Sequence, residues 1–313
     1  MTGFVLRRIG QALIALFGVS VVVFALVHLV PGDPIRAALG TRFDPEIYQV
    51  LLERSGLDQP LGVQFFDWLG RALTGDLGVS FRSGRAVTTE LGDRLPATLL
   101  LAGGSLLVGL IIAIPAGIIS AVRQGKPVDY AASTFAQVGV SVPDFWFGIL
   151  LILLFSRTLG WLPPGGYVSL TEDPVEALQR LLLPAVTAGV VTGSILTRFV
   201  RSSVLEAMQA DHVRLARAKG MPERYVLRHH VLRNAWIPVV TITGLQLATL
   251  LGGIVVVEVV FSWPGIGRLA LDAVYGRDYP VLQGSVLVIA AGFLLINLLV
   301  DLLYGRLDPR IRS

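Results

Sequence analysis

Six long apolar segments alternate with polar ones along this chain and predict membrane-spanning helices. They run roughly over residues 9–30, 97–121, 130–156, 181–203, 235–260 and 281–304. Each is about as long as the roughly 20 residues that a helix needs to cross a bilayer. Pro143 should bend or start a helix, and Gly189 and Gly193 form a small-xxx-small pair suited to close helix packing. The pattern predicts an all-α polytopic membrane protein with six transmembrane helices.

The first two spans are separated by a long polar segment, residues 31–96. Within it, DPEIYQVLLERSGLD and VQFFDWLGRAL have the pattern of short amphipathic helices, and the turn-rich stretch GDLGVSFRSGR follows them. A segment of this length and polarity is neither a simple loop nor a span. We expect it to form a small folded cap outside the membrane.

The composition supports a membrane protein. The chain is 53% hydrophobic and 15% charged, whereas a soluble domain carries about 25% charged residues. Its first apolar segment is about twice as long as the core of a signal peptide, so we expect it to be retained. The absence of cysteine excludes disulfides and thiolate chemistry. Arginine and lysine retained on the cytoplasmic side explain the net charge of +4 more simply than nucleic-acid binding does.

The distribution of basic residues predicts that both termini face the cytoplasm. An even number of spans places both termini on one side, and that side holds fifteen of the 26 lysines and arginines. Most of the others lie in the segment 31–96, which is long enough to cross the membrane regardless of its charge. The predicted parts are a cytoplasmic N-terminus with the first helix (1–30), an extracytoplasmic segment (31–96), a five-helix core (97–304) and a cytoplasmic tail (305–313).

One polar segment on the predicted cytoplasmic side, residues 204–234, combines helix-forming residues with a turn. Residues 203–219 favour a helix, and Gly220 suits the left-handed position after a helix end. Pro222 suits the first turn of a second helix that continues into the fifth span. A mostly apolar stripe is predicted along the first helix, formed by Leu205, Met208, His212, Leu215 and Lys219. This arrangement suits a rigid lever that meets a cytosolic partner, and a helix lying on anionic lipid is the alternative.

Several stretches of the sequence resemble one family of transporters. EAMQADHVRLARAKG followed by LRNAWIPVV resembles the EAA loop of binding-protein-dependent ABC importer permeases, especially those of the dipeptide/oligopeptide/nickel family. HLVPGDP, GDLGVSFRSG, VSVPDFWFGILL, VVVEVVFSWPGIGRL and RDYPVLQG resemble other family segments, in the family's order. The long segment 31–96 resembles that of the B-type permease subunit rather than its C-type partner. The resemblance covers essentially the whole chain and implies the type I ABC importer permease fold.

The resemblance implies that residues 204–234 carry the coupling helix, which lies in a groove of an ATPase subunit. The candidate coupling residues are Glu206, Asp211, His212, Ala216, Lys219 and Gly220. Glu206 and Asp211 would meet basic groups of the ATPase, Ala216 would keep the contact close, and Gly220 would set the turn. His212 departs from the family, which usually has an aromatic residue after the aspartate, and this change could tune the strength of docking.

The resemblance also implies partners. The sequence contains no G-x-x-x-x-G-K-[ST] motif, so the chain cannot form a Walker A phosphate site. We expect no enzyme activity and no bound cofactor in this chain, with ATP and Mg on two separate ATPase subunits. A second, C-type permease and an extracytoplasmic binding protein would complete an importer in a prokaryotic plasma membrane. Short peptides are the cargo that the resemblance favours, while nickel chelates and glutathione stay open.

Two further groups of residues are candidates for function. Polar residues inside spans are costly and often line a pathway, although hydrogen bonding between helices also explains them. The pathway candidates are Gln137, Asp144, Gln246, Glu258 and Asn297. The segment FSWPGIGRLALDAVYGRDYP should either reach a docked binding protein or fold back as a plug. Its candidate contact residues are Trp263, Pro264, Gly265, Arg268, Tyr275, Arg277 and Asp278.

The alternative function is a secondary transporter or a channel for a small solute. Such a protein would use intramembrane acids for ion coupling, and only Asp144 and Glu258 are available for that. It would have no need for the cytoplasmic lever of residues 204–234.

Overall fold

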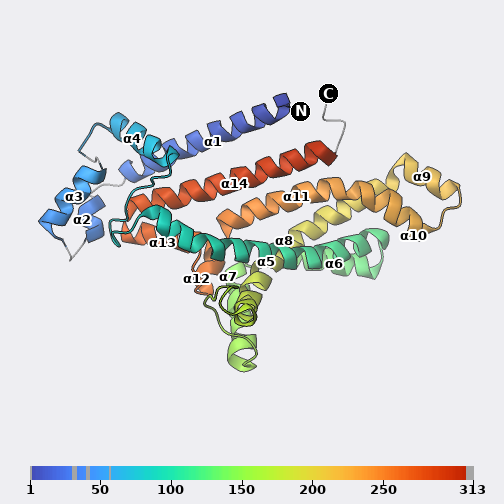
Figure 1. Ribbon diagram of the computed structural model, residues 1–313. Coiled ribbons are helices and arrows are strands. Elements are labelled where there is room, and N and C mark those ends of the chain that lie inside the picture. The colour runs from blue at the N-terminus through green and yellow to red at the C-terminus, as the bar shows by residue number, and fades with distance from the viewer. Residues whose placement is uncertain (1, 30–33, 40–42, 56–57, 308–313) are drawn as a thin grey trace. The chain divides into compact units, whose positions relative to one another are not determined.

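Helices are the main secondary structure in the part of the chain that the structure describes. The computed structural model describes residues 2–29, 34–39, 43–55 and 58–307, and within them the only β-type pairing is an isolated bridge between Val79 and Ala86. In chain order the helices are α1 (Thr2–Leu29), α2 (Pro34–Leu39), α3 (Pro45–Ser55), α4 (Leu61–Leu73), α5 (Val87–Val122), α6 (Pro127–Ser141), α7 (Asp144–Leu151), α8 (Pro174–Gln209), α9 (Asp211–Ala218), α10 (Glu223–Val226), α11 (Leu232–Gly253), α12 (Val255–Val260), α13 (Ile266–Gly276) and α14 (Tyr279–Leu307) (Figure 1). The predicted all-α fold is confirmed.

The chain folds as two compact units. One consists of Leu100–Trp263 together with the C-terminal part from Ile296, and the other of Thr2–Leu99 together with Pro264–Leu295. The segment after Trp263 therefore groups with the N-terminal third of the chain.

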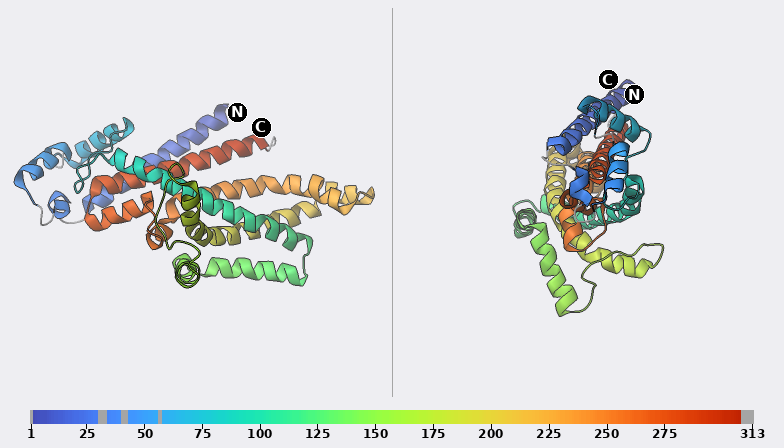
Figure 2. Two further views of the ribbon diagram at one scale, coloured as in Figure 1. Left: turned by 60° about the horizontal axis from the view of Figure 1, so that its bottom comes forward. Right: turned by 90° about the vertical axis from the view of Figure 1, so that its left-hand side faces the viewer.

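Among the described residues, five helical segments are long and apolar enough to cross a membrane, and they lie in α1, α5, α8, α10 with α11, and α14. A sixth span requires α6 together with α7 and its π-helical continuation, Ile152–Thr158, although the two parts are bent by 100° (Figure 2). Pro143 explains the bend. It is the N-cap of α7 and has no amide hydrogen, and Val142 before it is extended at φ −81°, ψ 126°. Pro143 starts a helix as predicted, and the third predicted span is broken.

Several helix ends differ from the positions predicted by hydropathy, because polar residues extend the spans. Helix α5 begins at Val87, so the predicted external segment 31–96 ends inside a helix. Helix α8 begins after Asp173, whose carboxylate accepts hydrogen bonds from the amides of Val175 (2.9 Å) and Glu176 (3.0 Å). The fifth predicted span ends at Gly253 and is followed by the short helix α12. Most of the predicted tail 305–313 lies outside the described residues.

Helix α8 is central to the first unit, where glycines allow close packing. A Cβ atom added at Gly189 would lie 2.7 Å from the Cβ of Val108 in α5, and one at Gly193 would lie 3.0 Å from the carbonyl oxygen of Gly109. Both glycines therefore let α5 and α8 approach closely, as predicted. Gly139 plays the same part for α6, since its own Cβ would collide with Ser194 of α8.

In the second unit, α4 packs against the second half of α1. The ring of Phe65 lies 6.0 Å from that of Phe17 and 5.3 Å from that of Phe24, both nearly at right angles. One turn beyond Phe24, Nε2 of His28 is hydrogen-bonded to Oε1 of Gln64 at 2.9 Å. The predicted amphipathic helix at VQFFDWLGRAL is confirmed as α4, and α3 lies within the stretch DPEIYQVLLERSGLD.

Candidate functional site

The polar segment 204–234, which we call the coupling hairpin, joins α8 to α11. Helix α8 stops at Ala210, which is extended (φ −65°, ψ 145°), and α9 follows at once. Helix α9 ends in a Schellman motif: the amide of Met221 donates to the carbonyl of Ala216 at 3.3 Å, and that of Gly220 to Arg217 at 2.9 Å. Gly220 is left-handed at φ +75°. The predicted turn at Gly220 is confirmed, but the single helix predicted over 203–219 is two helices.

A π-helical segment, Leu227–Val231, connects α10 to α11 without a break. Pro222 precedes α10 as its N-cap, one position earlier than predicted. Hydrogen bonds in a π-helix run from residue i to i+5, so residues five apart lie one above the other. Val226 and Val231 are accordingly both buried in the same apolar core. The second helix of the hairpin continues into the fifth span, as predicted.

An apolar core attaches the coupling hairpin to the long helices on either side of it. The buried members are Ala121 of α5, Val200, Val204 and Ala207 of α8, Val213 and Ala216 of α9, Val226 and Val231, and Ala235 and Val239 of α11. Removing apolar side chains from water is the main stabilising contribution to such packing. The hairpin is therefore fixed to its supporting helices and does not hang from them as a flexible linker.

The apolar stripe predicted along the hairpin is only partly right. Leu205 and Met208 pack against the core, whereas His212, Leu215 and Lys219 are exposed. The break at Ala210 is the reason, because it resets the helical phase and brings Val213 and Ala216 to the packed side of α9. Ala216 requires a correction as well. Its side chain is only 4% exposed, so it packs inside the hairpin and is not available to a partner.

Polar contacts that were not predicted close the hairpin. The guanidinium of Arg217 donates from Nε to Oε2 of Glu223 at 3.1 Å and from Nη2 to Oε1 at 2.6 Å, across the turn at Gly220. This hydrogen bonding raises the pKa of Arg217. Nδ2 of Asn234 donates to Nε2 of His212 at 2.9 Å. Opposite charges on the two sides of the Gly220 turn were the available sequence signal.

The remaining candidate coupling residues are on the surface. Glu206, Asp211 and Lys219 are exposed. Asp211 lies 3.8 Å from the guanidinium of Arg214, a distance at which an exposed ion pair contributes little. Leu215 adds an exposed apolar side chain next to these charges. The hairpin thus presents acidic, basic and apolar groups on a rigid support.

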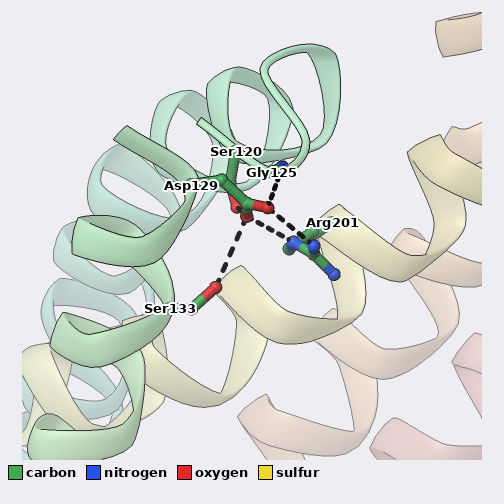
Figure 3. Close-up of polar contacts among 5 residues, drawn as sticks. All are labelled: Ser120, Gly125, Asp129, Ser133 and Arg201. Carbon is green, nitrogen blue, oxygen red and sulfur yellow. Dashed lines mark hydrogen bonds and ion pairs between the residues drawn. The ribbon is translucent and has the colours of Figure 1, made fainter. Parts of the chain in front are cut away.

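An ion pair between a buried carboxylate and a partly exposed arginine joins the helices near the hairpin (Figure 3). Arg201 of α8 donates from Nε and Nη2 to the two carboxylate oxygens of Asp129 in α6, at 2.8 and 2.9 Å. The hydroxyl of Ser120 in α5 donates to the same carboxylate at 2.5 Å, and the amide of Gly125 donates at 3.0 Å. Val200, next to Arg201, belongs to the hairpin core. An acid at the start of one apolar segment and an arginine near the end of another were the only sequence signals.

The five pathway candidates lie in five helices of the first unit. Gln137 is exposed on α6, while Gln246 and Asn297 are half-buried. Asp144 is the first residue of α7, and its carboxylate accepts a hydrogen bond from the amide of Phe145 at 2.8 Å. Glu258 is 1% exposed in α12. Glu258 therefore does not line open space in this structure, which corrects its assignment to the pathway surface.

The predicted contact residues for a binding protein divide into buried and exposed ones. Trp263, Gly265 and Asp278 are buried, so these three assignments are wrong. The ring of Trp263 packs edge-on against Tyr167, with centroids 5.1 Å apart. The exposed candidates are Tyr275, which is 80% exposed, and Arg277, while Pro264 and Arg268 are half-buried.

Asp278 has a structural part in the second unit. Its carboxylate accepts hydrogen bonds from the hydroxyl of Ser80 at 2.5 Å and from the amides of Phe81 at 3.1 Å and Arg82 at 3.4 Å. Burial raises the pKa of the Asp278 carboxyl, and these hydrogen bonds oppose that rise. The contacts join the turn after α4 to the corner between α13 and α14.

These features define a class of protein. It is a polytopic membrane protein that presents a rigid polar hairpin beyond the ends of two long helices and has no nucleotide-binding motif in its sequence. Comparison with known proteins gives the family.

The chain belongs to the family of binding-protein-dependent transport system inner membrane components. The family description matches residues 113–313, and that of the family's N-terminal region matches residues 1–102. The chain is 40% identical over 333 aligned positions to the di/tripeptide transport system permease protein DppB of Pseudomonas aeruginosa, covering 100% of this chain and 99% of the relative. It is 43% identical over 312 positions to the glutathione transport system permease protein GsiC of Escherichia coli K12, with the same coverage.

A solved structure of the MetNI methionine ABC transporter shares the fold. One of its chains superposes with a TM-score of 0.59 at 19% identity, covering 70% of this chain and 96% of that one. The protein is a multi-pass inner membrane permease of an ABC importer.

Proposed function

We propose that this chain pairs with a second, C-type permease to form a pathway for short peptides, which an extracytoplasmic binding protein delivers. Two separate ATPase subunits, which carry ATP and Mg, drive the transport, and one of them docks on the coupling hairpin. The peptide cargo is supported by the relatives named for di/tripeptide and glutathione transport. The partners are supported by the family, whose members are components of binding-protein-dependent systems.

The observation that carries this proposal is the rigid attachment of the coupling hairpin. Helix α9 shares one apolar core with α8 and α11, and Arg217 and Glu223 close its turn. A displacement of α9 by a moving ATPase is therefore passed to two membrane-crossing helices together. Glu206, Asp211 and Lys219 provide exposed charges for the contact, while Leu215 provides an apolar anchor.

A charge reversal on the hairpin tests the coupling role. The variant Glu206→Arg/Asp211→Arg is compared with Glu53→Arg/Glu172→Arg, which makes the same charge change at exposed residues of α3 and of the segment before α8. The tagged complex is purified from native membranes in mild detergent, and co-purified ATPase and uptake of a labelled dipeptide are measured. We expect the hairpin variant to lose most of both and the control to retain them. Equal retention in both variants would exclude docking through these residues.

We also propose that both termini and the coupling hairpin face the cytoplasm, because the basic residues concentrate on that side. The chain has no cysteine, so a single introduced cysteine can be labelled without background labelling of native cysteines. Arg123→Cys, in the turn between α5 and α6, should be protected from a membrane-impermeant maleimide in intact cells. Glu172→Cys should be labelled. Labelling of Arg123→Cys and protection of Glu172→Cys would show that the chain has the opposite orientation in the membrane.

A further inference from the structure

A polar pocket of about 240 Å³ lies between α5, α6 and α8 of the first unit, and the coupling hairpin does not explain it. One of the pathway candidates, Gln137, is among its lining residues. Its lining includes Ser120, Ser133, Gln137, Thr197, Arg198 and Arg201. We call it the arginine pocket.

The arginine pocket has unused donors for an anion. The carboxylate of Asp129 accepts hydrogen bonds from Nε and Nη2 of Arg201, so Nη1 of that guanidinium is not used by Asp129 (Figure 3). Neither this Nη1 nor the side chain of Arg198 makes a hydrogen bond or an ion pair with any residue that the structure describes. The pocket lining thus holds two arginines, and only Arg201 is paired with a carboxylate, that of Asp129. Guanidinium groups bind phosphate well because their planar donors match its oxygens.

Exposed apolar residues continue the same face of α6 on both sides of the pocket. Tyr130 lies three residues before Ser133 and is 66% exposed, and Val140 lies three residues after Gln137 and is 41% exposed. Residues three apart in a helix are neighbours on one face. Phe199, next to Arg198 on α8, is also exposed. A ligand that fits this surface combines an anionic head with an apolar chain.

The position of the pocket agrees with such a ligand. Two of the helices that line it, α5 and α8, are long and apolar enough to cross a membrane, and the pocket lies beside the ion pair at the hairpin end of α8. Basic pockets between transmembrane helices are known to bind phospholipid head groups. A soluble oxyanion or the carboxylate of a peptide would use the arginines but would leave the apolar flanks unoccupied.

We propose that the arginine pocket binds the phosphate of an anionic phospholipid, with Arg198 and Nη1 of Arg201 contacting the phosphate and an acyl chain lying along α6. Because Ser120 and Arg201 also hold Asp129, a bound lipid would add to the attachment of α5, α6 and α8 near the coupling hairpin.

The test is lipid binding to the purified, delipidated complex by native mass spectrometry. Phosphatidylglycerol is titrated, with phosphatidylcholine of the same acyl chains in parallel. We expect Arg198→Gln to reduce bound phosphatidylglycerol at least fivefold and Arg198→Lys to have a smaller effect. The matched control Arg123→Gln removes an exposed arginine outside the pocket and should bind as the unmodified protein does. Arg198 is exposed, so we expect its variants to fold, and size-exclusion chromatography of each variant checks this.

Three results would overturn the proposal. The first is equal binding of phosphatidylglycerol by the Arg198→Gln and Arg123→Gln proteins. The second is complete displacement of the lipid by millimolar inorganic phosphate, which would make the pocket a site for soluble phosphate. The third is displacement by a dipeptide, which would assign the pocket to the cargo. None of these results affects the coupling test, since that test depends on ATPase retention and uptake.

Discussion

The ion pair between Asp129 and Arg201 offers a quantitative test of how the helices near the coupling hairpin are held. The change is Asp129→Ala. The Asp129 side chain is 6% exposed and that of Arg201 is 30% exposed. Removing the carboxylate leaves the guanidinium without its anion and the buried hydroxyl of Ser120 without its acceptor.

The expected loss of stability follows from this burial. Breaking a buried pair by removing one partner costs about 3–5 kcal/mol, because the other charge stays buried and unpaired. Arg201 is partly exposed and can regain some hydration, so we expect about 3 kcal/mol, at the lower end. This corresponds to roughly a hundredfold change in the ratio of folded to unfolded protein.

The assay is reversible unfolding in mixed micelles of increasing SDS fraction, followed by tryptophan fluorescence. The matched control is Asp93→Ala, which breaks the 2.8 Å pair with Arg85, whose side chains are 54% and 58% exposed. That loss should stay below about 1 kcal/mol. The double variant Asp129→Ala/Arg201→Met should recover about 1–2 kcal/mol relative to Asp129→Ala alone. A loss at Asp129 no larger than the loss at Asp93 would refute the reasoning.

Two further predictions concern helix packing and the second unit. Gly189→Ala should lower the free energy of unfolding by about 1–3 kcal/mol in the same assay, since the added Cβ would overlap Val108. The control Gly103→Ala has open space at its Cβ and should leave the stability unchanged or raise it. Equal effects of the two variants would contradict the close approach of α5 and α8. Asp278→Ala should lower the free energy of unfolding by about 2–3 kcal/mol, because the buried hydroxyl of Ser80 and the amide of Phe81 lose their acceptor. Asp278→Asn should lower it less. Because burial raises the pKa of Asp278 in the fold, its contribution to stability is full below the ordinary value of 3.8 and is lost as pH rises through the raised value. Asp278→Asn should abolish this pH dependence, and an unchanged thermal unfolding profile between pH 3.5 and 7 would count against a buried carboxyl.

The spans and the turn at Gly220 could be predicted because their signals are local. Hydropathy marks apolar segments, and a glycine after a helix-forming stretch marks a left-handed end. The bend at Pro143 was expected, but its size was not, because the angle depends on what α7 packs against. Gly148 of α7, for example, lies against Phe261 and Thr187.

Burial and pairing in the loops could not be predicted, because they depend on contacts between distant parts of the sequence. Trp263 and Asp278 were candidates for contact with a binding protein because their segment joins the last two predicted spans outside the membrane, and a packed plug was the alternative. In the structure Trp263 meets Tyr167 and Asp278 meets Ser80. The pair of Asp129 and Arg201 has the same origin, since its members are 72 residues apart.

The π-helical segment Leu227–Val231 fixes the direction in which the coupling hairpin faces. It accommodates one more residue than an α-helical turn, so that Val226 and Val231 share a face with Ala235 and Val239. Deleting one residue from it would rotate α10 by about 100° relative to α11. The hairpin would keep its length and its charges, but its charged side chains would face a different direction around the axis of α11. In this protein a single inserted residue sets the angular register between the membrane helices and whatever drives them.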